Sequence, residues 1–110
     1  MTAYVLSEVE ILDPDSVGRY KEAAPATIAA YGGTYLARDA VPEAFEGAFD
    51  AGERIVLIRF PDARAARGWY SSAEYQAAIE TASGGLRRRL FVFDGLEAPV
   101  TSVSATEQNT

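Results

Sequence analysis

The sequence predicts an α+β domain whose elements follow the order strand, helix, strand, strand, helix, strand. The pair Gly32-Gly33 separates a stretch with helical spacing from the strand-like residues 34–38, and glycine ends helices readily because it adopts the left-handed cap conformation. Farther along, residues 54–60 form a nearly continuous apolar run that Pro61 ends. Such a run is typical of a buried, central strand.

The first third of the chain predicts a strand followed by a helix. Residues 3–11 alternate and are rich in Val, Leu and Ile, as in a half-buried strand. Asp13-Pro14-Asp15 is typical of a helix start, with an Asp cap and Pro at the first helical position. Pro25 lies inside this helix and is expected to kink it or divide it in two. The residues at helical spacing form one apolar stripe: Val17, Tyr20, Ala24, Ile28 and Tyr31.

The rest of the chain supplies three more strands and a second helix. Residues 34–38, 54–60 and 88–94 are predicted strands, and residues 39–52 are expected to be irregular or a short β arm. Pro61-Asp62 opens the second helix, which Gly84-Gly85 ends.

A capping-box pattern within this second helix, Ser71-Ser72-Ala73-Glu74, is expected to restart it after a bend. The complete order is the split-βαβ, ferredoxin-like arrangement, in which one antiparallel sheet carries both helices on one face. Residues 1–96 are expected to form this domain, and the polar residues 97–110 a disordered C-terminal tail.

Composition excludes several classes of function. The net charge of −6 argues against a nucleic-acid partner, because phosphate backbones repel an acidic chain. The chain has no Cys and no His, which removes disulfides, thiolate chemistry and the commonest general base and metal ligand. We therefore expect no metal and no cofactor. The beginning of the chain lacks a charged leader, and no apolar run is long enough to span a membrane, so a cytoplasmic protein without membrane contact is expected.

The face of the sheet that carries no helix predicts a homodimer. Alternation along the strands assigns seven sizeable apolar residues to this open face: Tyr4, Leu6, Leu36, Ile55, Leu57, Phe91 and Phe93. An uncovered patch of this size is unusual in a monomer. A second copy of the same sheet, packed face to face, is the simplest cover.

Two clusters of residues resemble a known family. The first contains Tyr31-Gly32-Gly33, Tyr35-Leu36, Arg38 and Glu46-Gly47, and the second contains Phe60-Pro61, Trp69-Tyr70-Ser71-Ser72 and Glu74-Tyr75-Gln76. Together with Arg54 they resemble the domain-of-unknown-function family numbered 1330, over roughly residues 3–95.

The resemblance implies a dimeric α+β barrel, since that is the group to which the family belongs. The family has no firmly assigned activity, and the wider group includes small-molecule monooxygenases, haem-degrading enzymes and lactone isomerases. The chain departs from the family pattern at residues 39–42, which replace a glycine-rich turn. The absence of His makes the haem and metal relatives poor guides.

Three charged residues are candidates for a ligand pocket. Alternation assigns Glu8, Arg38 and Arg59 to the open face. A charge buried there must form an ion pair, keep its contact with water or bind a ligand. One interpretation is a pocket in each half-barrel where an arginine binds a carboxylate or enolate. The alternative is a salt bridge from Glu8 to Arg59 or Arg38 that fixes the dimer register.

Glu46 and several aromatic residues complete the candidate site. Glu46, beside Phe45 and Phe49, is the candidate general base and would act with Arg38, although its residue type favours the alternative, a surface carboxylate on a loop. The aromatic candidates for ligand contact, each of which also fits the core, are Tyr35, Trp69, Tyr70 and Tyr75. Two functions therefore stay open: a small-molecule binder or cofactor-independent enzyme, and a non-catalytic homodimeric module. The sequence leaves open whether the protein is an enzyme.

Overall fold

The computed structural model describes residues 1–96 and has the predicted ferredoxin-like α+β architecture. The predicted tail at residues 97–110 lies outside the described residues. The second predicted helix consists of two consecutive helices. The elements are β1 (Ala3–Ile11), α1 (Pro14–Ala30), β2 (Thr34–Ala40), β3 (Glu53–Phe60), α2 (Ala63–Ser71), α3 (Ala73–Glu80) and β4 (Leu86–Asp94).

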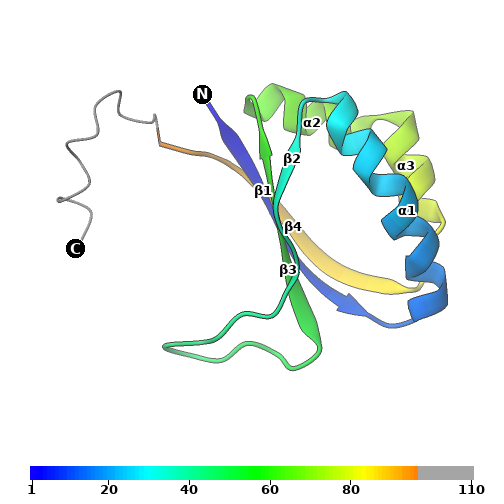
Figure 1. Ribbon diagram of the computed structural model, residues 1–110, viewed down its shortest axis with the longest axis vertical. Helices are drawn as coiled ribbons and strands as arrows, with labels where there is room; N and C mark the ends of the chain where they lie inside the picture. Colours follow the sequence, from blue (N-terminus) through cyan, green and yellow to red (C-terminus); the bar gives the residue numbers. More distant parts are fainter. Residues whose placement is uncertain (97–110) are drawn as a thin grey trace.

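The four strands form one antiparallel sheet in the order β2-β3-β1-β4, and all three helices cover the same face (Figure 1). β1 is central, since Val5 pairs with Ile58 on β3 and with Val92 on β4. The connection at residues 41–52 projects on the side of the sheet opposite the helices (Figure 1). Within residues 1–96, no helix has the length and apolarity that a membrane crossing needs.

The predicted capping residues act as expected. The Asp13 side chain accepts a hydrogen bond from the Asp15 backbone N–H at the start of α1, and Ser72 accepts one from Tyr75 at the start of α3. Pro25 does not divide α1, which runs as one element from residue 14 to residue 30.

The core lies between the sheet and the helices. Gly33 contributes by its small size, because a Cβ there would lie 2.6 Å from Ile28 and 2.7 Å from Phe60. The Trp69 indole Nε1 donates to the Thr27 hydroxyl at 3.1 Å, which satisfies the polar atom of the largest core side chain. The buried cluster comprises Val5, Ile28, Ile58, Phe60, Ala66, Trp69 and Tyr75.

β2 departs from regular alternation, and this corrects the predicted position of Arg38. The pairing with β3 shifts between Tyr35 and Ala37 and again between Ala37 and Ala40. The first irregularity places Ala37 opposite Leu57 of the open face, so the next side chain, Arg38, points to the helix side instead. Asp39 has a positive φ of 55°, a conformation that Asp adopts more readily than most residues.

Candidate functional site: a cavity between α1 and the sheet

An interior cavity of about 50 Å³ lies between α1 and the helix side of the sheet. One water molecule needs roughly 10–15 Å³ of such space, so the cavity has room for a few waters or a very small organic molecule. Most of its wall is apolar, supplied by Val9, Ile11, Val17, Ile28, Val56, Ile58, Trp69, Leu86 and Leu90. The polar groups in this wall define what the cavity can bind.

Arg88 is a cation in the cavity wall, in addition to Lys21 and Arg38. It lies on the helix side of β4, because it pairs with Val9 of β1, whereas its neighbours Arg87 and Arg89 lie on the open face. Its guanidinium is 5.7 Å from the ring centre of Tyr20 and 5.6 Å from that of Tyr75, and it donates to the Tyr20 hydroxyl at 3.2 Å. Within residues 1–96, no carboxylate lies within ion-pair distance of Arg88.

The surroundings of Arg88 keep it charged. Burial opposes the charge, but the adjacent oxygens of Tyr75 and Tyr20 outweigh it and raise the pKa of the guanidinium. The two tyrosine hydroxyls lie 2.9 Å apart and hydrogen-bond to each other. Burial, followed by the proximity of Tyr20, raises the pKa of Tyr75, and burial raises that of Tyr35. Tyr75 and Tyr35 therefore act as neutral hydrogen-bonding groups and not as bases at neutral pH.

Ser7 is another polar residue of the cavity wall. It lies on the central strand β1 between the inward-facing Val5 and Val9, and it is 4% exposed. Ser7 lines the cavity, and its buried hydroxyl has no hydrogen-bond partner in the part of the chain that the structure describes. Buried hydroxyls are usually paired, because leaving water without a new partner costs free energy.

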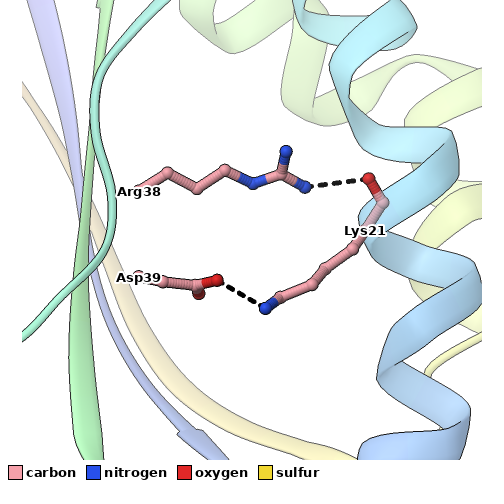
Figure 2. Close-up of polar contacts among 3 residues, drawn as sticks. All are labelled: Lys21, Arg38 and Asp39. Carbon is pink, nitrogen blue, oxygen red and sulfur yellow. Dashed lines mark hydrogen bonds and ion pairs between the residues drawn. The ribbon is translucent and has the colours of Figure 1, made fainter.

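The end of the cavity nearest to solvent is bounded by three linked residues. Arg38 Nη2 donates to the Lys21 carbonyl oxygen at 2.8 Å, and Lys21 Nζ forms an ion pair with Asp39. Figure 2 shows both β2 side chains reaching across to α1. Arg38 and Asp39 are exposed lining residues, so any route into the cavity at this end passes these contacts.

Some of the predicted site residues meet at this cavity. Tyr35 and Trp69 line it, and Tyr75 is fully buried and hydrogen-bonded to Tyr20, which also lines it. Arg38 lies at its exposed end with its guanidinium 4.8 Å from the Tyr35 ring centre. This cavity is on the helix side of the sheet, so the predicted position of Arg38 on the open face is wrong.

The other predicted residues lie elsewhere. Glu8 and Arg59 are on the open face, where Glu8 pairs with Arg89 at 2.8 Å and not with Arg59 or Arg38 as the sequence suggested. Glu46 is exposed in the 41–52 connection, and its neighbour Phe45 is 90% exposed, so the expected apolar surroundings are missing. Tyr70 is largely exposed on α2 and does not line the cavity.

Sequence reasoning missed Ser7 and Arg88. Both carried a usable signal, because each is a polar residue whose nearest inward neighbours on its strand are apolar: Val5 and Val9 for Ser7, and Leu86 and Leu90 for Arg88. In the run Arg87-Arg88-Arg89, alternation along the strand turns only the middle residue inward. Within residues 1–96, no three acidic side chains gather closely enough to hold a metal ion.

Solved structures of similar fold come from several bacteria. A protein of unknown function from Rhodopseudomonas palustris is 15% identical, with a TM-score of 0.69 over 88% of this chain and 84% of its own. SnoaB, a cofactor-independent oxygenase from Streptomyces nogalater, is 9% identical, with a TM-score of 0.63 over 91% of this chain and 98% of its own. A dimeric ferredoxin-like protein of unknown function from Thermobifida fusca is 16% identical, with a TM-score of 0.57 over 84% and 90%.

At these identities the structures establish the shared fold and nothing of the chemistry. No curated protein is significantly similar to the chain in sequence. The sequence model of a domain of unknown function, DUF1330, matches residues 2–96, nearly all of the described chain. The protein therefore belongs to the DUF1330 family.

Proposed function

We propose that the protein binds a small organic anion, a carboxylate or an enolate, in the cavity between α1 and the sheet. The observation that carries this proposal is Arg88, a cation in the cavity wall without a carboxylate partner among residues 1–96. A charge removed from water is stabilised by an opposite charge, and guanidinium–carboxylate hydrogen bonds are among the strongest in proteins. A ligand oxygen bearing negative charge supplies that partner.

The same arrangement suits cofactor-independent chemistry on an enolisable carbonyl compound. Arg88 favours the enolate over its neutral parent, and the Tyr20 hydroxyl beside it adds a hydrogen-bonding group. SnoaB supports this proposal, because that protein has the same fold and is a cofactor-independent oxygenase. The segment that carries Glu46 projects away from the helices (Figure 1). The geometry therefore adds no support for Glu46 as general base, and that role stays a prediction.

The open face supports a second proposal, a homodimer with the sheets face to face. Leu36, Phe91 and Phe93 are 48%, 46% and 47% exposed there, and the dimeric relative from Thermobifida fusca has the same fold. Four of the charges on this face are already paired, as Glu8–Arg89 and Glu10–Arg87, whereas Arg59 forms no ion pair within residues 1–96. This pairing favours a structural role for the open face, so a non-catalytic dimer module is the alternative function.

Trp69 provides the test of anion binding. It is the only tryptophan of the chain and lines the cavity, so its fluorescence reports occupancy. We expect propionate to change this fluorescence at millimolar concentration and the neutral propionamide to have no effect. Arg88→Met should weaken propionate binding roughly tenfold or more, since a hydrogen bond to a charged group is lost.

Arg89→Met is the matched control, because Arg89 is on the same strand but faces the opposite side of the sheet. Equal responses to propionate and propionamide, or equal losses in the two variants, would contradict the proposed site.

A further inference from the structure

The Ser7 hydroxyl, which has no partner within residues 1–96, indicates more closely which class of ligand the cavity binds. Ser7 pairs with Leu90 and the next inward residue of β1, Val9, pairs with Arg88. Ser7 and Arg88 are therefore diagonal neighbours on the same face of adjacent strands, a separation that side chains and a small ligand can bridge. Both line the same cavity, and each has hydrogen-bonding capacity that the described chain leaves unused.

We infer that Ser7 is a ligand-binding residue and that the cavity takes a short-chain hydroxy or oxo acid, with its acid oxygens at Arg88 and its second oxygen at Ser7. This inference rests on the proposed function. A hydroxyl group both donates and accepts, so it pairs with either a ligand hydroxyl or a ligand carbonyl. The size of the cavity, about 50 Å³, restricts the ligand to a few non-hydrogen atoms.

The composition of β1 argues against a purely structural role for this hydroxyl. Val5 and Val9 flank Ser7 on the inward face, and the neighbouring strands place Val56 and Leu90 beside it. A small apolar residue would serve packing at this position without the cost of an unpaired hydroxyl. Binding and stability should therefore respond to its removal in opposite directions.

The test compares hydroxy acids with their alkyl isosteres, again by Trp69 fluorescence on the full chain. The probes are glycolate, 3-hydroxypropionate and 4-hydroxybutyrate, each paired with the acid in which a methyl group replaces the hydroxyl: propionate, butyrate and valerate. We expect at least one hydroxy acid to bind about three- to tenfold more tightly than its isostere. Ser7→Ala should abolish that preference and leave the binding of the alkyl acids unchanged.

The thermal midpoint of the ligand-free protein is the second readout. We expect Ser7→Ala to leave it unchanged or raise it by a few degrees, because the variant removes an unpaired buried hydroxyl. Ser83→Ala, at an exposed serine, is the control.

Two outcomes would overturn the inference while leaving the proposed function intact. One is Arg88-dependent binding in which hydroxy acids and isosteres bind equally, as when Ser7 bonds only to water. The other is a hydroxyl preference that survives in Ser7→Ala. An absence of response to every acid would instead overturn the proposed function itself, and the inference with it.

Discussion

Arg38 supplies the hydrogen bond that Pro25 cannot make. In a regular α-helix the N–H of residue 25 would donate to the carbonyl of Lys21, four positions earlier, but proline has no N–H. Arg38 Nη2 donates to that carbonyl oxygen at 2.8 Å, from a neighbouring strand (Figure 2). This contact explains why α1 tolerates an internal proline without being divided. It also gives Arg38 a structural function that the sequence did not suggest.

A double-mutant cycle tests this relationship. We expect Arg38→Ala to lower the free energy of unfolding by about 1 kcal/mol, the usual net value of one hydrogen bond. In the Pro25→Ala background the helix N–H is restored, so the same substitution should cost measurably less. Urea denaturation of the four proteins measures the difference. Arg64→Ala, at an exposed arginine of α2, is the control, and equal costs of Arg38→Ala in both backgrounds would contradict the relationship.

The Tyr20–Tyr75 hydrogen bond joins α1 to α3, and Arg88 donates a hydrogen bond to the same Tyr20 hydroxyl. We expect Tyr20→Phe to cost about 1–2 kcal/mol, because it leaves the fully buried Tyr75 hydroxyl without its tyrosine partner. The double variant Tyr20→Phe/Tyr75→Phe should cost less than the sum of the single variants. Chemical denaturation measures these values, and strict additivity would indicate that the two hydroxyls do not interact.

Alkaline pH should destabilise the protein through the buried tyrosines. Burial raises the pKa of Tyr75 and of Tyr35 above the value of about 10 that a tyrosine has in the unfolded chain. Between the two values the folded state binds more protons than the unfolded state, so stability falls as pH rises. The stability due to this difference is fully present below pH ~10 and declines above it, by up to ~1.4 kcal/mol per pH unit for the fully buried Tyr75 and by less for the partly exposed Tyr35.

Unfolding midpoints measured across this range, in the parent and in Tyr75→Phe, check the prediction. The variant should lose stability less steeply with pH. A parent curve that is flat above pH ~10 would be inconsistent with buried, neutral phenols.

Two glycines should respond to alanine in opposite directions. A Cβ at Gly33 would lie 2.6 Å from Ile28 and 2.7 Å from Phe60, whereas at Gly18 in α1 it would meet nothing within 4 Å. We expect Gly33→Ala to destabilise by about 1–3 kcal/mol through overpacking, and Gly18→Ala to stabilise by about 0.5–1 kcal/mol. Thermal and urea unfolding measure both changes, and a neutral Gly33→Ala would mean that the core is looser than the contacts indicate.

The proposed dimer is tested by a charge in the middle of the open face. Leu57 pairs with Leu6 on β1 and Ala37 on β2, so Leu57→Glu places a carboxylate at the proposed interface. We expect the parent to sediment as a dimer at micromolar concentration and the variant as a folded monomer, since an unpaired charge is costly at a buried interface. Leu12→Glu, an exposed position after β1, is the control. A monomeric parent would overturn the proposal.

Local physical chemistry made most of the fold predictable from the sequence. The alternation in β1, the Asp13-Pro14 start and the capping serine before α3 are local signals, and the structure uses each of them. The assignment of Val5, Ile58 and Leu90 to the helix side likewise follows from a period of two. The absence of Cys and His is also a property of the sequence alone.

The site depended on tertiary structure because small departures from regularity decide where side chains point. One irregularity in β2 places Arg38 on the helix side instead of the open face. No residue type in the strand predicts such a shift in register. The association of Tyr20, Tyr75 and Arg88 joins α1 to α3 and β4, and α1 is distant in sequence from both. The sequence by itself determined the order of the elements and the two faces of the sheet, because these depend on local propensity and period. Only the packing of α1 on the sheet decided which polar groups share a cavity, because that depends on contacts between distant segments.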